Sequence, residues 1–322
     1  MPSRSLPTLI ALGAVVATTA IGSVGCGSGH GKVAAKVGEC TTLYLDMGYA
    51  KRPYKICVPS SYDIDAKNNP FPVVLNFHGW GDNIDTDLRE AQVWAAVQQD
   101  ATSAFVVHPQ GYGDNTGNLN TWGSWHINGT GESPGPAGPT CNPSGGNTAY
   151  CYTSCQDADG KCDDVGCSWT TCVDDYAFIT ALLDAVEDNF CIDTAREYAT
   201  GCSNGGMMAY GLGANQAQRF AAVAPQCGSF PRGYVDAPDA AVGMPLMDVH
   251  GSDDVIVPAN LTAFNTGPDD TTYPLSQDGW YYTQLSEILD GWTSANGCEG
   301  EAMHYATSYD GDIGLYVRQA WP

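Results

Sequence analysis

The chain has 322 residues, of which 43% are hydrophobic and 10% aromatic. This composition supports a sizeable core and excludes general disorder. Its 36 Asp and Glu against 13 Lys and Arg give a formal net charge of −23, which excludes the basic surface that nucleic-acid binding needs and disfavours strongly acidic polymers as substrates.

The first 26 residues are typical of a secretory signal peptide. Arg4 is the only charged residue among them, and an apolar stretch from Leu9 to Val24 follows it. The stretch is short for a membrane span and ends in small residues. Ser23-Val24-Gly25-Cys26 also resembles a lipoprotein cleavage site, so simple cleavage and lipid anchoring through Cys26 both stay open. In either case the chain is expected to be secreted or extracellular.

After a Gly-rich spacer at 27–39, segments with strand and helix patterns alternate. The run Pro72–Phe77 is continuously apolar, as in a strand buried on both faces, and Asp174–Phe190 carries an apolar stripe at helical spacing. Strands are predicted at 41–45, 54–58, 72–77, 105–107, 197–200, 221–224, 246–249 and 313–317, and helices at 87–99, 174–190, 204–212 and 279–293. This alternation predicts one α/β domain over 40–322 with a doubly wound, mostly parallel sheet.

Residues 111–172 interrupt this alternation and are rich in Gly, Asn, Pro and Cys. The cysteines of this insertion are Cys141, Cys151, Cys155, Cys162, Cys167 and Cys172. In an oxidising compartment they are expected to form a disulfide-stapled insertion. A zinc site is the alternative, but no CxxC pair with a matching second pair is present. Asp157 and Asp159 lie in an acidic loop for which calcium binding and a solvated turn both stay open.

Gly201-Cys202-Ser203-Asn204-Gly205 is a G-x-S-x-G pentapeptide between a predicted strand and a predicted helix. That is the context of a nucleophile elbow, a sharp turn in which small neighbours leave room for a strained serine. Ser203 is therefore the predicted nucleophile. The alternative is an ordinary Gly-rich turn in which Ser203 caps the helix. Cys202 is expected either to brace the turn through a disulfide or to be a buried free thiol.

His78 and Gly79 follow the predicted strand at 72–77. A His-Gly pair in this place commonly positions a backbone N–H that stabilises the oxyanion of an acyl-transfer reaction. The predicted oxyanion donors are the backbone amides of Trp80 and of Asn204, the residue after the nucleophile. His78 itself need not react, and a structural role for it is compatible with this prediction.

The segment His250–Pro258 follows the predicted strand at 246–249 and contains Asp253 and Asp254. A carboxylate in this position, after the serine in the chain, agrees with the order of an α/β-hydrolase triad. The two aspartates compete for the role of the acid. An Asp that caps a turn is the alternative for one of them.

Together these residues resemble the secreted esterase family of polyhydroxybutyrate (PHB) depolymerases and feruloyl esterases. The resemblance extends from about Pro53 to Pro258 and includes GCSNGGMMAY around Ser203 and HGSDDVIVP around Asp254. It implies an α/β-hydrolase fold and serine esterase chemistry that needs no cofactor or metal. It also implies that Asp254, the fourth residue after the His of the His-Gly motif, is the triad acid.

The family has its general base in a C-terminal Gly-His-x-Trp-Pro-like segment. Here Trp321-Pro322 is present, but Gln319 occupies the position of the His, and His304 is the only His after Asp254. Three interpretations stay open: the sequence is truncated or misread near its end, His304 substitutes for the base, or the chain is a catalytically inactive secreted binding protein on the hydrolase fold.

The resemblance implies feruloyl or acetyl esters of plant polysaccharide, or a polyester, as the substrate; no partner protein is inferred. Aromatic residues of the insertion are expected either to form a rim that binds sugars or phenolic groups, or simply to fill the stapled loop. The first interpretation favours feruloyl-type substrates. These residues are Tyr112, Trp122, Trp125, Tyr150, Tyr152 and Trp169.

Overall fold

The computed structural model describes residues 35–298 apart from internal gaps at 64–68, 91–92, 100–102, 115–121, 143–149, 158–161, 163–165 and 269. The predicted signal peptide with Cys26, the predicted strand at 313–317, His304 and Gln319 all lie outside the described residues. In the part that is described, no helix has the length and apolar character needed to cross a membrane.

A six-stranded sheet forms the centre of the structure, with the spatial order β1-β2-β4-β3-β5-β6. The strands are β1 (Cys40–Asp46), β2 (Lys51–Cys57), β3 (Phe71–Phe77), β4 (Phe105–Pro109), β5 (Ile192–Cys202) and β6 (Ala222–Gln226). The pairs β1–β2 and β2–β4 are antiparallel, whereas β4, β3, β5 and β6 run parallel to one another. The prediction of a mostly parallel sheet is therefore confirmed.

The segment 246–249 adds a short parallel extension beside β6. Bridges pair Leu246 with Val223 and Val249 with Gln226, and the Val249 N–H donates to the Pro225 carbonyl at 3.1 Å. The carboxyl ends of β3, β5, β6 and this segment consequently meet at one edge of the sheet. The loops that carry the predicted site residues leave the sheet at this edge.

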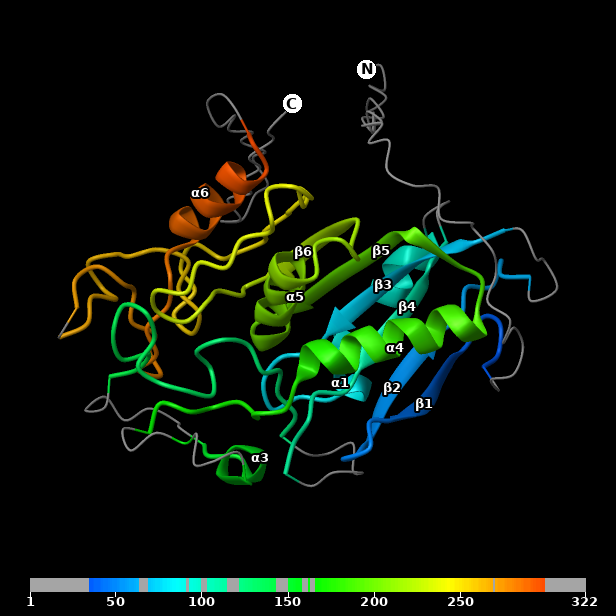
Figure 1. Cartoon of the computed structure of the whole chain (residues 1–322), viewed down its shortest axis with the longest axis horizontal. Coiled ribbons are helices and arrows are strands. Elements are labelled where there is room, and N and C mark those ends of the chain that lie inside the picture. Colours follow the sequence, from blue (N-terminus) through cyan, green and yellow to red (C-terminus); the bar gives the residue numbers. More distant parts are fainter. Residues whose placement is uncertain are drawn as a thin grey trace, which may run out of the picture.

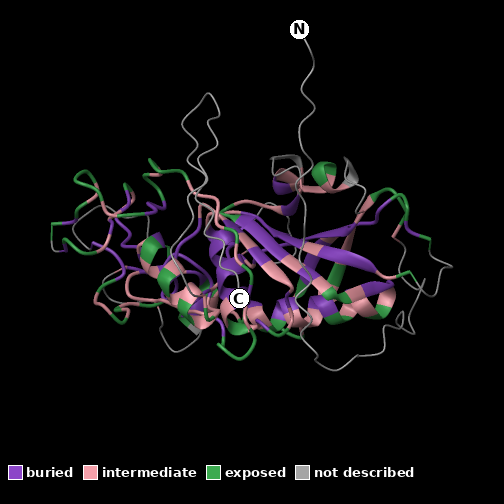
Figure 2. Cartoon of the chain, turned by 90° about the horizontal axis from the view of Figure 1, so that it is seen from above, coloured by how far each residue is buried: buried purple, intermediate pink, exposed green. Residues whose placement is uncertain are grey.

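Helices cover both faces of the sheet: α4 and α5 lie against one face, and α1 and α2 against the other (Figures 1 and 2). The helices are α1 (Ile84–Glu90), α2 (Val93–Gln99), α3 (Thr153–Asp157), α4 (Asp175–Asn189), α5 (Asn204–Asn215) and α6 (Leu285–Ala295). In α4 the predicted apolar stripe is buried, and the Asp174 side chain caps the helix by accepting from the Ala177 N–H. This doubly wound arrangement, with a strand–serine–helix turn after β5, is the α/β-hydrolase fold.

The core lies on both faces of the central strands. Every residue of β4 is buried, and so are six of the seven residues of β3, because these strands have a neighbouring strand on each side and a helix layer on each face. Figure 2 shows the buried residues gathered in the strands. The strand ends, and the loops that follow them, are therefore held by the most densely packed part of the molecule.

Two predicted helices differ from those observed. The predicted helix at 87–99 is divided into α1 and α2, and α1 begins earlier because the Asn83 side chain accepts hydrogen bonds from two backbone N–H groups of its first turn. The predicted helix at 279–293 begins only at Leu285. The residues before it are extended and bridge to other loops, with Trp280 opposite Cys141 and Tyr282 opposite Pro231.

Five disulfides join described cysteines: Cys40–Cys57, Cys141–Cys167, Cys151–Cys162, Cys155–Cys172 and Cys202–Cys227. Three of them use all six cysteines of the insertion, which confirms the stapled loop and leaves none of these sulfurs for zinc. Cys191 is disulfide-bonded as well, and Cys298 is a free thiol. The pattern is that of a protein folded in an oxidising compartment.

Candidate active site

Ser203 stands on the sharp turn between β5 and α5. Its backbone has φ 58° and ψ −123°, a left-handed conformation that is uncommon for a residue other than glycine. The side chain makes no capping hydrogen bond to α5, so the interpretation of Ser203 as a helix cap is not supported. The geometry is that of a nucleophile elbow, in which the hydroxyl is held away from the backbone of its own helix.

The glycines of the pentapeptide allow this turn to press against β3. A Cβ atom on Gly201 or on Gly205 would collide with the carbonyl oxygen of Phe77. On the other side, a Cβ on Gly79 would lie 3.7 Å from the Ser203 Cβ. The loop after β3 therefore lies directly against Ser203, as the sequence predicts for an oxyanion-hole loop.

The Cys202–Cys227 disulfide fastens the elbow to the end of β6. This decides between the two expectations for Cys202 in favour of the disulfide. The Ser203 N–H donates to the Gln226 carbonyl at 3.0 Å and lies 3.3 Å from the Cys227 sulfur. The backbone of Ser203 is thus held by both a covalent and a hydrogen-bonded link to the neighbouring strand.

The two predicted oxyanion donors belong to the residue after Ser203 and to the loop after β3. Asn204 is the first residue of α5 and Trp80 follows Gly79. Within the described chain neither backbone N–H donates to a backbone carbonyl outside its own helix or strand. Both are therefore compatible with donation to a developing oxyanion, and α5 contributes the positive end of its helix dipole at the same point.

The ring of His78 is buried and both of its nitrogens are engaged. Nδ1 lies 2.7 Å from the Gly79 carbonyl, to which it donates, and Nε2 accepts from the Gly111 N–H at 2.9 Å. Burial lowers the pKa of His78, in agreement with the acceptor role of Nε2 toward the Gly111 N–H. These contacts tie the loop after β3 to the loop after β4 and give His78 the structural role that the sequence allowed.

Asn204 has a second function that the sequence did not reveal. Its fully buried side chain accepts the Trp125 N–H through Oδ1 at 2.7 Å and donates to the Trp125 carbonyl through Nδ2 at 3.0 Å. The Trp125 indole in turn donates to the His78 carbonyl at 2.9 Å. The start of the insertion therefore connects both loops that carry the predicted oxyanion donors.

Asp254 follows the segment 246–249 in the chain, and this segment ends at the same edge of the sheet as the strand before Ser203. Its Oδ1 accepts hydrogen bonds from the N–H groups of Ile256 and Val257, each at 2.9 Å. Its Oδ2 lies 3.8 Å from His250 Nε2. Asp254 is therefore the aspartate that caps the turn, and one of its oxygens remains directed away from these bonds, whereas Asp253 is exposed.

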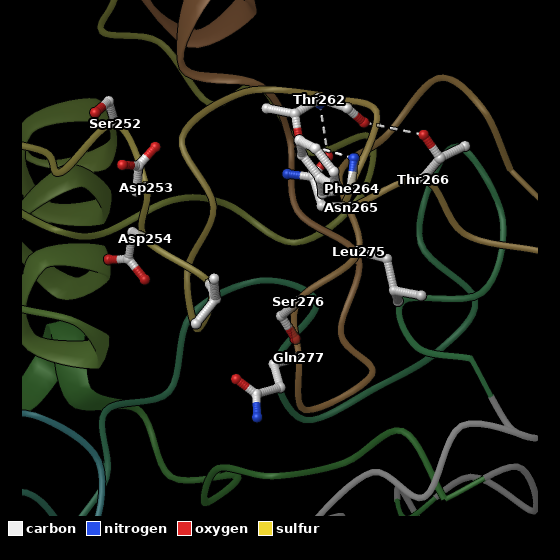
Figure 3. A pocket seen from close by; sticks show the side chains of 11 residues that line it. Ser252, Asp253, Asp254, Thr262, Phe264, Asn265, Thr266, Leu275, Ser276 and Gln277 are labelled. Atoms are coloured by element: carbon white, nitrogen blue, oxygen red, sulfur yellow. Dashed lines mark hydrogen bonds between the residues drawn. The ribbon is translucent and has the colours of Figure 1, made fainter.

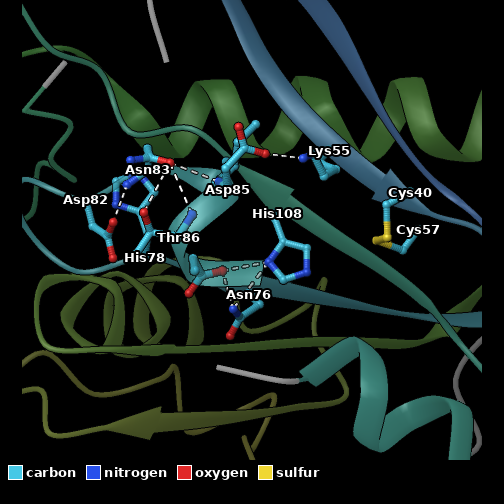
Figure 4. Close-up of polar contacts among 12 residues, drawn as sticks. Cys40, Lys55, Cys57, Asn76, His78, Asp82, Asn83, Asp85, Thr86 and His108 are labelled. Carbon is cyan, nitrogen blue, oxygen red and sulfur yellow. Dashed lines mark hydrogen bonds and ion pairs between the residues drawn. A yellow bond between two sulfur atoms is a disulfide. The ribbon is translucent and has the colours of Figure 1, made fainter. Parts of the chain in front are cut away.

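The described histidines do not include a base bonded to Ser203. His250 donates from Nε2 to the Val257 carbonyl at 2.6 Å. His108 pairs through Nδ1 with Asp87 at 2.6 Å, and Asn76 donates to the same carboxylate oxygen; Figure 4 shows His108 beside Asn76, at the end of the sheet's central strands. Both sequence candidates for the missing base, His304 and the position of Gln319, lie outside the described residues.

An aromatic wall extends from the oxyanion loop. The Trp80 ring packs edge-on against Trp122 with ring centroids 5.0 Å apart, and against Trp169 at 6.4 Å. Trp122 is 60% exposed, whereas Trp125, Tyr152 and Trp169 are buried. The predicted aromatic set therefore divides: part of it fills the stapled loop, and Trp122 offers a free ring face beside the site.

A pocket of about 440 Å³ lies next to Asp254 (Figure 3). The loop 252–255 lines one wall, and residues from 262–266 and 275–277 line the opposite wall. Within the described part of the chain, no group of three or more His, Cys, Asp or Glu side chains is arranged to hold a metal ion. Asp159, one of the two aspartates considered for calcium, lies outside the described residues.

Sequence comparison connects the chain with fungal esterases. No protein-family model matches it. A feruloyl esterase C of Emericella nidulans is 26% identical over 287 residues, which cover 85% of this chain and 81% of the relative. A "Probable feruloyl esterase C" of Aspergillus niger is 25% identical over 254 residues, covering 78% and 69%.

Among solved structures, a thermostable esterase overlaps 68% of this chain and 48% of its own, with 21% identity and a TM-score of 0.44. The fold is identified from the strand order and the turn at Ser203. Over most of its length, then, the chain is similar in sequence to proteins named feruloyl esterase C.

Proposed function

We propose that the chain is a secreted serine carboxylesterase that hydrolyses esters carried on plant polysaccharide, with feruloyl or acetyl groups as the acyl part. The similarity to feruloyl esterases over most of the chain supports hydrolysis of esters. Five disulfides and the leader-like residues 1–26 support export. The domain spans 40–322, and lipid attachment through Cys26 is the alternative to simple release.

In the proposed reaction Ser203 Oγ attacks the carbonyl carbon of the ester, and an imidazole accepts its proton. Asp254 Oδ2 orients that imidazole. The N–H groups of Trp80 and Asn204 stabilise the oxyanion of the tetrahedral intermediate. When the intermediate collapses, the C–O bond to the alcohol breaks and the imidazolium returns the proton to the leaving oxygen. Water then hydrolyses the acyl-enzyme by the same route.

One observation carries the proposal: Ser203 has a left-handed backbone between β5 and α5, and Gly79 of the oxyanion loop packs against it. We expect Ser203→Ala to lower kcat on p-nitrophenyl acetate by about 10³-fold or more, and a serine-directed organophosphorus reagent to label the protein at this residue. Ser286→Ala, at an exposed position on α6, is the matched control. Unchanged turnover by Ser203→Ala excludes Ser203 as the nucleophile.

The identity of the base is tested separately. If His304 is the base, His304→Ala lowers kcat as far as Ser203→Ala does. If the protein is inactive with its present C-terminal residues, a chain extended with a Gly-His-x-Trp-Pro tail should gain turnover. The contrasting function, an inactive secreted binding protein, is favoured by Gln319 at the family's His position. It requires that the protein hydrolyse no ester in either form.

A polyester substrate is the second enzymatic candidate, since the resemblance includes polyhydroxybutyrate depolymerases. The exposed ring of Trp122 beside Trp80 favours an aromatic acyl group instead. Parallel assays on methyl ferulate, on acetylated xylan and on a poly(3-hydroxybutyrate) film separate the candidates. Turnover of the film with no turnover of the two other esters contradicts the proposed substrate class.

A further inference from the structure

The pocket beside Asp254 has the polar lining of a site for a neutral, hydroxyl-rich ligand. Eleven side chains line it, and none of them carries a positive charge. Hydroxyl and amide groups from Thr262, Asn265 and Gln277 share the lining with the carboxylates of Asp253 and Asp254. An anion is disfavoured by the two carboxylates, whereas sugar hydroxyls can donate to carboxylate and amide oxygens and accept from amide N–H groups.

Phe264 adds an apolar surface to this polar lining. Its side chain is fully exposed, at 100%. Because Phe264 lines the pocket, this exposed ring is available to a ligand bound there. The apolar face of a sugar ring is a suitable partner for an aromatic face.

The loop that carries Phe264 is held by its own hydrogen bonds. The Thr262 N–H donates to Asn265 Oδ1 at 2.6 Å, and Asn265 Nδ2 donates to the Asn260 carbonyl at 2.9 Å. Thr266 Oγ1 donates to the Thr262 carbonyl at 3.0 Å, and Leu275 N–H donates to the Asn265 carbonyl at 2.8 Å. The ring is thus presented on a preformed loop, which reduces the entropy lost when a ligand binds.

The pocket lies next to the proposed triad acid rather than at the nucleophile. Asp254 lines it, whereas Ser203 does not. In a serine esterase the acid bonds the imidazole on the side away from the serine, so a ligand in this pocket lies beside the reacting centre and not within it. A polymeric substrate can occupy both places at once.

We propose that this pocket is a saccharide subsite that binds a neutral sugar unit of the polysaccharide that carries the ester, with Phe264 as the stacking platform and Asp253, Asn265 and Gln277 as hydroxyl partners. The inference rests on the proposed esterase function for the presence of an ester on that polysaccharide. The binding itself needs no turnover. The proposed subsite identifies the carrier of the ester as a neutral polysaccharide, which the residues near the acyl group do not indicate.

Binding is measured first, by calorimetric titration of the full-length Ser203→Ala protein with xylohexaose. We expect Phe264→Ala, made in the Ser203→Ala protein, to weaken binding about five- to tenfold through loss of the aromatic contact. Tyr44→Ala removes another exposed aromatic side chain, on β1 and outside the pocket, and is the matched control. An oligogalacturonate of the same length should bind more weakly than xylohexaose, because it is anionic.

Kinetics then locate the subsite. With Ser203 intact, Phe264→Ala should raise the ratio of KM for acetylated xylo-oligosaccharides to KM for p-nitrophenyl acetate by a similar factor, whereas Tyr44→Ala should leave both KM values unchanged. No xylohexaose binding, equal binding by Phe264→Ala, or stronger binding of oligogalacturonate overturns the subsite. Binding that depends on Phe264 in a protein without esterase activity sustains the subsite and overturns the proposed reaction, so the two failures are distinguishable.

Discussion

The carboxamide of Asn204 holds both backbone polar groups of Trp125, at 2.7 Å and 3.0 Å, although the two residues are 79 positions apart in the chain. Asn204 also supplies a proposed oxyanion donor through its own backbone. Trp125, through its indole, holds the loop that supplies the other donor. The two donors are thus positioned relative to each other by a residue of the insertion rather than by the sheet alone.

We expect Asn204→Ala to lower both stability and kcat. The change leaves the buried Trp125 N–H and carbonyl without partners, at a cost of about 1–3 kcal/mol for each group, while the Asn204 backbone N–H is retained. The Tm and kcat on p-nitrophenyl acetate are the measurements. Asn128→Ala removes an exposed amide contact to Asp236 and should change neither. A kcat that stays at the wild-type value shows that the hydrogen bonds between Asn204 and Trp125 do not position the oxyanion donors.

The Cys202–Cys227 disulfide should matter for catalysis as well as for stability. Replacing both cysteines by Ala removes the covalent link between the turn at Ser203 and the end of β6, so we expect kcat to fall with little change in KM. Thermal unfolding should show a loss of about 2–4 kcal/mol.

The matched control is the Cys151–Cys162 pair of the insertion, which can be replaced in the same way. It should lower the stability of the insertion and leave kcat on a small ester near the wild-type value. If both double variants lose kcat equally, the effect of Cys202–Cys227 is one of general stability and not of positioning.

Trp122 is expected to contribute to the recognition of an aromatic acyl group. Trp122→Ala removes the exposed ring that packs against Trp80 and should raise KM for methyl ferulate about three- to tenfold. KM for p-nitrophenyl acetate should change little, since an acetyl group is too small to cover the ring. Equal changes for both esters argue instead for a disturbed oxyanion loop. Tyr44→Ala is again the control for an exposed aromatic residue.

Glu197 should make the stability depend on pH. Burial, the largest cause, raises the pKa of this β5 carboxyl from an ordinary 4.5 to about 8, although Arg219 pairs with it at 3.1 Å. The folded state therefore keeps a proton that the unfolded chain has released. As a result, this group's contribution to the free energy of unfolding falls as the pH rises from about 4.5 to about 8.

Glu197→Gln carries no titrating proton, so its Tm relative to the wild type should rise between pH 5 and pH 8. Differential scanning calorimetry at both pH values measures this difference. Glu39→Gln, at a surface ion pair with Lys36, should show no such trend. A constant difference between Glu197→Gln and the wild type means that Arg219 keeps Glu197 ionised throughout.

The sequence predicted those parts of the structure that are determined by a local residue pattern. Continuous apolar runs locate β3 and β4, because strands buried on both faces need no alternation. The small residues around Ser203 locate the elbow, because only glycine fits beside the Phe77 carbonyl. The alternatives at Cys202 needed the structure, since the partner of a cysteine depends on which strand ends lie side by side.

The sequence could not predict contacts between loops that lie far apart in the chain. Nothing in the residues around Trp280 distinguishes a helical start from the extended segment that bridges to Cys141. The side chain of Asn204 gives no sign that it binds Trp125, and the pocket beside Asp254 is built from two loops that only the fold brings together. The sequence indicated Asp254 through resemblance, but not that its Oδ1 is occupied by the N–H groups of Ile256 and Val257.

For the design of chimaeric enzymes, Trp125 marks a boundary. Residues next to it belong by sequence to the Cys-rich insertion, yet an exchange that includes Trp125 would alter the spacing of the two proposed oxyanion donors. The loop closed by Cys151–Cys162 has no such attachment to Asn204 or His78 among its described residues. A loop grafted from another esterase between these cysteines must therefore keep Cys155, which is bonded to Cys172, and must leave the Trp125 segment unchanged.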